Sequence, residues 1–515
     1  MTVALSDGKR NLWCGIAAAV SALLLWAAYP PHSETLAILV ALVPMLVVAR
    51  LSSPKRSALI FFLFGFLFWV LSLSWMPAII KNNGPWPLVL LGWFALAAAC
   101  AGYMALFGFW AAWLWRRRER VRFPALFAIV CLFAEAGLWA LIEYLRATLF
   151  TGFAWNFLGT AFATLPSFAT PARFGGVYLV SALVVLLNGV FATLLLRVFA
   201  PVLGIAEGIP SRSRLVGRLV QIAETGLPLA FILACLCVGN WMVRDGAARD
   251  GEPTYLRVAL VQRNAPCCFK PGKRENAYEA FGQLLDVAAA AKPDLVVLAE
   301  SAMAEFGAVR SFRAQDVARD FLKRADAKLL MAGGDDVVSN RTYNAVALYA
   351  PDGEAAGDLR AVYHKQHLVP FGEYIPFDKW ITPLQKLSPV GVSLHPGEPT
   401  LFSVDVGGRT LKIAPLICYE DTDPALAAKA KKMGADLIVL VTNDSWFSNS
   451  AEAEAHTAQA VLRAVETGLP IVRVGNSGVT GVIRPDGTAR WLSDDAGRPL
   501  VDAPGILLET VAVPK

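Results

Sequence analysis

Charged residues are scarce in this chain: Asp, Glu, Lys and Arg make up 17% of its 515 residues, whereas 56% are hydrophobic. This composition excludes an ordinary soluble enzyme of the same length and indicates a membrane protein. The shortage is uneven, because charges are sparse up to about Met242 and normally frequent after it. We therefore predict a membrane domain over residues 1–243 and a water-exposed domain over residues 244–515.

Metal-site, disulfide and nucleic-acid patterns are also lacking. The eight cysteines have neither paired metal-ligand spacing nor the layout of a disulfide framework. Cys267 and Cys268 are adjacent, so a strained vicinal disulfide and two free thiols both stay open.

The second half carries no basic stripe with interleaved aromatics, and the net charge of +6 comes with arginines clustered in short loops of the first half. That placement favours an anionic membrane surface over nucleic acid, and no metal or organic cofactor is indicated.

Seven apolar segments are candidate membrane spans. They cover residues 12–29, 35–48, 58–80, 86–115, 123–145, 177–202 and 227–243. The first could be a signal peptide, but no small-residue cleavage site follows it and further spans do. The second is short.

Loop charges predict the orientation, because translocation of Lys and Arg is disfavoured. Basic residues gather at Lys9 and Arg10, at Arg50, Lys55 and Arg56, at 116–122 and at 212–218. The N-terminus is then cytoplasmic, provided that the short second segment makes a full crossing. After seven crossings, residues 244–515 lie outside the cytoplasmic membrane, where ATP and acyl-CoA are lacking and lipid is the available acyl source.

Ionisable residues inside the apolar segments are functional candidates. Glu135 lies in mid-segment, while Glu143 and Arg146 lie one turn apart near a helix end. A simple ion pair between Glu143 and Arg146 at the interface is the alternative.

The second half changes to short β-rich runs that alternate with helical ones. LRVALVQ, DLVVLAE, KLLMAGG and DLIVLVTND read as buried strands, and two Pro-Asp-Gly sequences mark hairpins. Continuous apolar strands between helices predict mixed sheets covered by helices.

Three of these strands end on residues with useful chemistry. DLVVLAE ends on Glu300, AVYHK on Lys365, and LKIAPLIC on Cys418. If the strands neighbour one another, a base, an amine and a thiol nucleophile converge and suffice for acyl transfer. Taken singly, each residue has a structural alternative. Glu300 and Lys365 could be solvated charges at strand ends, and Cys418 could be a buried thiol.

The sequence resembles a known superfamily at these positions. Five segments are similar, in order, to the Glu-Lys-Cys motifs of the nitrilase superfamily: LAESA, TYN, YHKQHLVPFGEYIP, LICYED and TNDSWF. KQHLVPFGEYIP is closest to its membrane branch, the apolipoprotein N-acyltransferases, and WALIEYLRATLFTGFAWNF resembles that family's membrane signature. The resemblance implies an αββα sandwich joined to a multi-pass helical membrane domain. It also implies a bacterial inner-membrane protein whose catalytic domain is periplasmic.

The resemblance further implies a reaction and its residues. An acyl chain would pass from a phospholipid, typically phosphatidylethanolamine, to the N-terminal amine of the diacylglyceryl-cysteine of apolipoproteins, by ping-pong chemistry through a thioester. Glu300 would be the base, Lys365 the oxyanion-stabilising amine and Cys418 the nucleophile. Supporting positions match Glu373, Glu420, Tyr419, Asn344 and Trp446. Residues 374–396 would form a lid on the membrane.

Departures from the family pattern leave alternatives open. Ala299 stands where the family usually has proline, and Arg263 and Ser448 stand where it usually has glycine. We also expect no membrane span after the strand at 505–513. An amidase or lipid hydrolase would result if water entered the site. A catalytically inert scaffold is the other alternative, although such a domain would not need the catalytic residue types.

Overall fold

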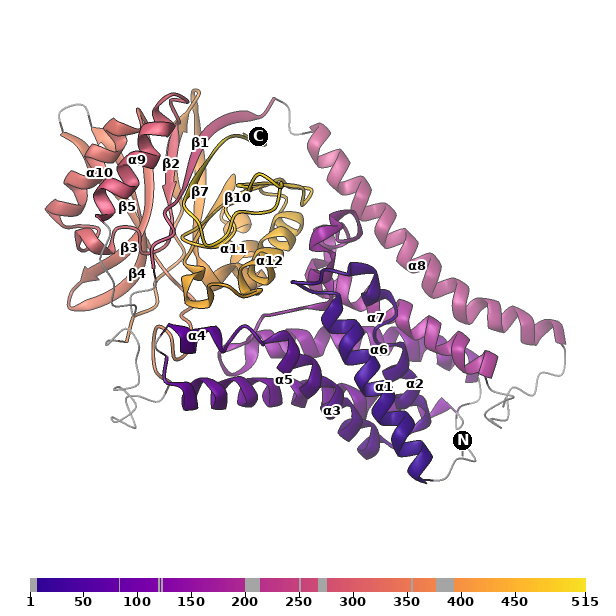
Figure 1. The fold of residues 1–515 in the computed structure, drawn as a ribbon. Coiled ribbons are helices and arrows are strands. Elements are labelled where there is room, and N and C mark those ends of the chain that lie inside the picture. The colour runs from indigo at the N-terminus through magenta and orange to yellow at the C-terminus, as the bar shows by residue number, and fades with distance from the viewer. Residues whose placement is uncertain are drawn as a thin grey trace. The chain divides into compact units, whose positions relative to one another are not determined.

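Two compact units make up the structure, a computed structural model (Figure 1). It describes residues 7–82, 84–118, 121, 124–199, 214–249, 252–266, 276–352, 355–376 and 393–515. The first unit comprises Met1–Pro77 and Pro85–Met242, and the second comprises Ala78–Gly84 and Val243–Lys515. Cys267, Cys268 and residues 377–392 of the predicted lid lie outside the described residues.

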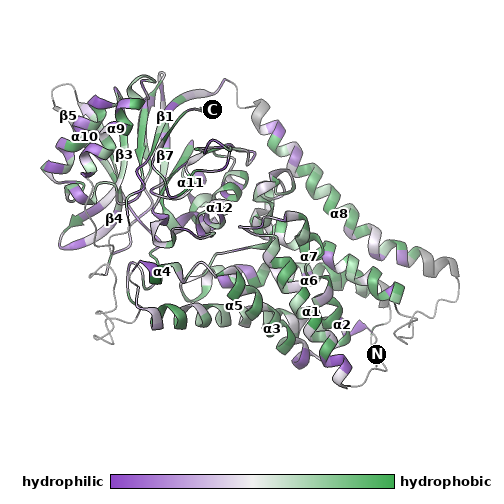
Figure 2. Cartoon of the chain, in the orientation of Figure 1, coloured by the Kyte–Doolittle hydropathy of each residue, from purple (hydrophilic) through white to green (hydrophobic). Residues whose placement is uncertain are grey.

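The first unit is helical and apolar (Figure 2). In the described part of the chain, six helices are long and apolar enough to cross a membrane. They lie within α1 (Asp7–Ala27), α3 (Pro54–Ser72), α5 (Trp86–Trp115), α6 (Pro124–Thr148), α7 (Ala172–Phe199) and α8 (Arg214–Arg249). Together with the sheets of the second unit, these helices confirm the predicted fold class.

The predicted second span differs from the others. Thr35–Leu51 consists of a 3₁₀ turn, η1 (Thr35–Leu39), and a nine-residue helix, α2 (Val43–Leu51). Pro44 in the first turn of α2 has no N–H to donate to an earlier carbonyl, so the helix begins afresh there. The apolar run hides this interruption, and Pro44 was the signal in the sequence that could have shown it.

Arg50 is not the loop charge that the orientation argument used. It lies on α2 with a 5% exposed side chain, and its Nη2 is 3.2 Å from Glu135 Oε2. Trp115 Nε1 donates to the other Glu135 oxygen at 2.5 Å. The two intramembrane charges therefore satisfy each other inside the unit.

Glu143 and Arg146 both hold the loop that follows α6. Glu143 accepts hydrogen bonds from Trp139 Nε1 and from the backbone N–H of Leu158, each at 2.9 Å. Arg146 Nη1 donates to the carbonyls of Phe153 and Trp155, each at 2.7 Å. This aromatic, glycine-containing loop is thus fixed by buried charge.

The second unit contains two six-stranded sheets. The first sheet has the order β12-β1-β2-β3-β4-β5 and the second has the order β11-β10-β9-β8-β7-β6. The strands are β1 (Thr254–Gln262), β2 (Leu295–Leu298), β3 (Leu329–Val338), β4 (Arg341–Asp352), β5 (Ala355–His364), β6 (Phe402–Val406), β7 (Arg409–Ile417), β8 (Leu437–Thr442), β9 (Ile471–Gly475), β10 (Gly481–Ile483), β11 (Ala489–Trp491) and β12 (Gly505–Val513). In each sheet three central strands are parallel and the remaining pairings are antiparallel.

Helices cover the outer faces of both sheets (Figure 1). The first sheet carries α9 (Ala277–Ala289) and α10 (Phe312–Arg324), and the second carries α11 (Pro424–Lys432) and α12 (Glu452–Thr467). A short helix, α4 (Ala78–Lys81), also belongs to this unit. The arrangement is the αββα sandwich that the family resemblance implied, and its mixed sheets covered by helices are those that the buried strands predicted.

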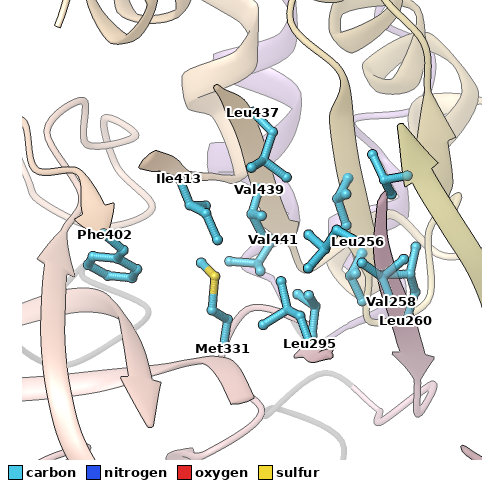
Figure 3. Packing of buried hydrophobic residues seen from close by; sticks show 14 of the residues in the cluster. Leu256, Val258, Leu260, Leu295, Met331, Phe402, Ile413, Leu437, Val439 and Val441 are labelled. Atoms are coloured by element: carbon cyan, nitrogen blue, oxygen red, sulfur yellow. The ribbon is translucent and has the colours of Figure 1, made fainter. Parts of the chain in front are cut away.

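The main core lies between the two sheets. Figure 3 shows Leu256, Met331, Ile413 and Val439 converging there, and each is fully shielded from solvent. A second core lies between the first sheet and its helices and includes Phe281 and Phe321. Strands such as β2 and β8 are buried along their whole length, because they pack against both layers.

Gly333 on β3 shows how tightly one strand end is packed. A Cβ atom at this position would lie 2.6 Å from Glu300 Cα and 2.7 Å from the Ala299 carbonyl oxygen, closer than van der Waals contact allows. Glycine is therefore required here by the close approach of the chain after β2.

We predict that Gly333→Ala destabilises the protein by about 1–3 kcal/mol, as expected for overpacking of a dense core. Tryptophan fluorescence during heating of the full chain in detergent would show a lower melting temperature. Gly102→Ala is the control, because its Cβ would have no neighbour within 4 Å. An unchanged melting temperature for Gly333→Ala would contradict the packing argument.

Candidate active site

Glu300, Lys365 and Cys418 come from three strand ends that are not neighbours. Glu300 follows β2 and Lys365 follows β5 in the first sheet, with β3 and β4 between them, while Cys418 follows β7 in the second sheet. From the sequence, convergence was expected only if these strands neighboured one another in one sheet. In the structure, the sandwich brings the residues together from both sheets.

The Lys365 ammonium group lies among carboxylates. Its Nζ is 2.9 Å from Glu373 Oε1 and 3.9 Å from Glu300 Oε1, and its side chain is 1% exposed. Asn344 Nδ2 donates to both carboxylates at 2.7 Å. A charge so deeply buried is tolerable only with such partners.

Burial and neighbouring charges set the ionisation of this group. Burial alone would lower the pKa of Lys365, but Glu373, Cys418 and Glu300 together raise it, so the amine stays protonated. Burial raises the pKa of Glu300, and the Lys365 ammonium opposes the rise. A carboxyl group with a raised pKa can accept and return a proton near neutral pH.

Cys418 begins the short helix η8 (Cys418–Thr422) in a strained conformation. Its φ is 51°, a left-handed value uncommon for a residue with a side chain. Burial raises the pKa of the Cys418 thiol, Glu300 raises it further, and Lys365 lowers it. The thiol therefore rests in the protonated form, and its reaction requires a base.

Glu420 joins the Cys418 turn to the segment after Lys365. It accepts hydrogen bonds from the backbone N–H groups of Gln366 at 2.6 Å and Ile417 at 2.8 Å, and from the Tyr363 hydroxyl at 2.8 Å. His367 N–H adds a fourth at 3.1 Å. With its oxygens occupied by donors, this carboxylate is suited to positioning rather than to proton transfer.

Tyr419 and Trp446 lie on the two loops beside this cluster. The Tyr419 ring meets the His367 ring edge-on, with centroids 5.7 Å apart. Trp446 lies in η9 (Asp444–Phe447), and Asn82 Nδ2 donates to its carbonyl at 2.7 Å and to the Ser445 carbonyl at 3.1 Å. Asn82 belongs to the same compact unit.

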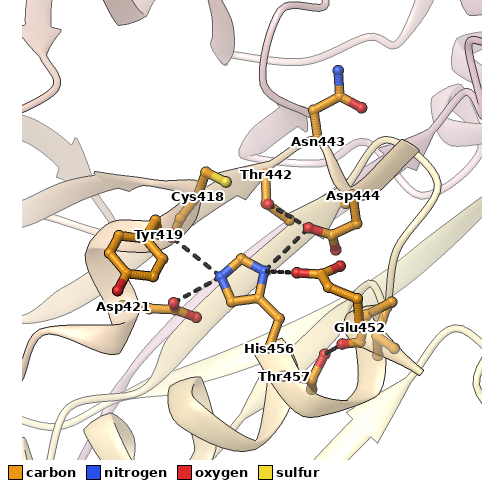
Figure 4. A network of polar contacts seen from close by, with 12 residues as sticks. Cys418, Tyr419, Asp421, Thr442, Asn443, Asp444, Glu452, His456 and Thr457 are labelled. Carbon is orange, nitrogen blue, oxygen red and sulfur yellow. Dashed lines mark hydrogen bonds and ion pairs between the residues drawn. The ribbon is translucent and has the colours of Figure 1, made fainter. Parts of the chain in front are cut away.

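A second charged cluster lies behind Cys418, and sequence reasoning missed it. It contains Asp421, Asp444, Glu452, His456 and Arg473, all buried (Figure 4 shows the first four). Arg473 in the middle of the buried strand IVRVG was the available signal, because a charge there needs a buried partner.

Donor atoms of Asp444, Glu452 and His456 lie within 4.8 Å of one another, close enough to hold a metal ion. However, the Arg473 guanidinium is 3.1 Å from Asp444 Oδ2 and supplies positive charge already. The distance of 3.1 Å between His456 Nδ1 and Asp444 Oδ1 is that of a hydrogen bond. We therefore assign no metal to these residues.

The two halves of the chain match two family models. Residues 21–190 match the apolipoprotein N-acyltransferase N-terminal domain, and residues 257–495 match the carbon-nitrogen hydrolase model. Among solved structures, an amidase from Nesterenkonia sp. is 20% identical, covers 51% of this chain and 92% of its own, and has a TM-score of 0.36.

Curated relatives match nearly the whole chain. The apolipoprotein N-acyltransferase of Geobacter metallireducens is 30% identical over 92% of this chain and 86% of its own length. That of Allorhizobium ampelinum is 32% identical over 84% of this chain and 76% of its own. With both domains matched in order, this chain belongs to the apolipoprotein N-acyltransferase family.

Proposed function

We propose that this protein transfers an acyl chain from a phospholipid to the N-terminal amine of a diacylglyceryl-apolipoprotein, through a thioester on Cys418. Phosphatidylethanolamine is the proposed donor. The observation that carries the proposal is the set of buried Glu300, buried Lys365 and half-buried Cys418, in a chain of this family. The set combines a base, a fixed positive charge and a thiol, which covalent acyl transfer needs.

The first half-reaction acylates the enzyme. Glu300 accepts the thiol proton while Cys418 Sγ attacks the ester carbonyl, and the Lys365 ammonium stabilises the resulting oxyanion. The tetrahedral intermediate collapses by breaking the bond to the glycerol oxygen. Glu300 returns the proton to that oxygen, so lysophospholipid leaves and the acyl chain stays on sulfur.

The second half-reaction forms the amide. The neutral acceptor amine attacks the thioester carbonyl, its proton passes to Glu300, and the same ammonium stabilises the oxyanion. The carbon–sulfur bond then breaks, and the Cys418 thiolate takes back the proton from Glu300. Asn344 orients Glu300 by donating to it, and Glu373, held by the same Asn344, orients Lys365 by accepting from its ammonium group.

Hydrolysis is the competing function of the same residues. If water attacked the thioester, the protein would be an amidase or lipid hydrolase. The relatives named as acyltransferases over both domains favour the amine as acceptor.

The membrane orientation has support within the first unit. Arg56 Nη2, near the start of α3, donates to Asn11 Oδ1, near the start of α1, at 2.6 Å. Both helices therefore begin on one side, although α1 with its 21 residues extends about 31 Å away from it. The chain between them, which contains Thr35–Leu51, must return across the same thickness. This supports seven crossings. With the cytoplasmic N-terminus that the loop charges predict, seven crossings put the catalytic domain on the periplasmic side of a bacterial inner membrane.

Incubation with phosphatidylethanolamine should add one acyl chain to the purified protein, and peptide mass spectrometry should place it on Cys418. Cys418→Ala should carry none. A diacylated lipopeptide should discharge the adduct, whereas water should do so slowly. Absence of the adduct would contradict the thioester mechanism, and equally rapid discharge by water would favour the hydrolase.

Glu420→Gln should slow enzyme acylation by about a hundredfold. Each Glu420 oxygen accepts from at least one backbone N–H group, so the amide nitrogen of Gln would face a donor and leave it unsatisfied, at about 1–3 kcal/mol. Single-turnover acylation followed by intact mass would measure the effect. Glu305→Gln, at an acid with a 39% exposed side chain, is the control and should react at the parent rate. Equal rates for the two variants would refute the positioning role of Glu420.

Truncated fusions to alkaline phosphatase test the crossings. A fusion after His32 should be active outside the cytoplasm, one after Arg56 should be inactive, and one after Lys515 should be active. The pair around Thr35–Leu51 is decisive, because equal signals at His32 and Arg56 would show that this short segment does not cross.

A further inference from the structure

His456 on α12 lies directly behind the nucleophile turn (Figure 4). Its Nε2 is 2.8 Å from Asp421 Oδ1 and 3.3 Å from the carbonyl oxygen of Cys418. Its Nδ1 is 3.1 Å from Asp444 Oδ1. All of these partners are acceptors, so both ring nitrogens must carry a proton, and the ring is a charged imidazolium.

The charges of this cluster balance in its interior. Arg473 Nη1 and Nη2 lie 3.3 Å and 3.1 Å from Asp421 and Asp444, and the side chains involved are at most 3% exposed. Two cations, His456 and Arg473, thus face two carboxylates. Glu452 lies 3.6 Å from His456. Burial, and to a lesser extent the charge of Asp444, raise the pKa of Glu452 to about 8, so this carboxyl group is mostly neutral at pH 7.

Ionisation of His456 follows from its neighbours on every side. Burial and Arg473 lower the pKa of His456, but Asp421 and Asp444 raise it to about 10. Burial raises the pKa of Asp444, yet His456 and Arg473 bring it down to about 2. Because the folded value for His456 exceeds its ordinary value, the charged ring stabilises the fold fully at acidic pH. That stabilisation is lost as the pH rises toward 10.

Asp444 links this balance to the thiol. Its charge raises the pKa of both Cys418 and Glu300, while the Thr442 hydroxyl, which donates to Asp444 at 2.7 Å, acts on Cys418 in the opposite direction. Loss of the His456 charge would leave one negative charge uncompensated behind Cys418. The thiolate would then form less readily.

We propose that His456 is a positioning residue of the acyl-transfer reaction: its charged ring binds the Cys418 carbonyl and cancels carboxylate charge behind the nucleophile. The role rests on the proposed function of Cys418 as the attacking thiol. It acts through Asp421, Asp444 and the backbone of Cys418.

The test is the pH profile of Cys418 alkylation by iodoacetamide, followed by peptide mass in the full chain. His456→Gln keeps a donor near the Nε2 position and His456→Asn keeps one near Nδ1, but both remove the charge. We expect each profile to move to alkaline pH by about one unit, with alkylation about tenfold slower at neutral pH and recovery at higher pH. Glu454→Gln, an exposed acid on the same helix, should keep the parent profile.

Loss of packing alone would reduce the reactive fraction without moving the midpoint, so an unmoved midpoint in both variants overturns the proposal. If the variants do not fold, ¹⁵N NMR of histidine-labelled parent protein decides. A charged ring without titration from pH 6 to 9 supports the proposal, and a neutral ring at pH 7 overturns it. If Cys418 of the parent is not alkylated in preference to the other cysteines, the proposed nucleophile fails instead, which is a separate result.

Discussion

The candidate site depends on one buried cation, the Lys365 ammonium group. An isolated charge with a 1% exposed side chain would be prohibitively costly, and its partners Glu373 and Glu300 make it tolerable. Asn344 holds both carboxylates, and Glu420 fixes the segment that follows Lys365 to the turn that contains Cys418. The Lys365 charge thus lies at the centre of a site that combines residues from both sheets.

The same low-polarity surroundings prepare the reaction. Burial keeps the Cys418 thiol protonated and raises the pKa of Glu300. The two groups interact electrostatically, so the carboxyl group that is to take the thiol proton belongs to the same site. Behind the turn, His456 and Arg473 balance Asp421 and Asp444. Lys365 thereby acts on the nucleophile directly, whereas His456 and Arg473 act indirectly, by cancelling carboxylate charge behind it.

Much of this could be predicted from sequence, because apolar strands and family motifs are local signals. The two sheets, their helices and the hairpins follow from residue patterns, and Glu300, Lys365 and Cys418 stand at recognisable strand ends. The assembly could not be predicted, because it joins two sheets and because β3 and β4 separate β2 from β5. Arg50 was misjudged as a loop charge and the cluster around His456 was missed. Arg473 within a buried strand indicates that a partner exists, but pairing over long sequence separations does not show which residue it is.

The central claim is that the acyl chain rests on the enzyme between two independent half-reactions. Rapid mixing of the protein with phospholipid, in the absence of any acceptor, tests it most directly. The account predicts a burst of lysophospholipid close to one equivalent per enzyme, followed by near arrest until a lipopeptide is added. Release of lysophospholipid only after the lipopeptide is present would contradict it.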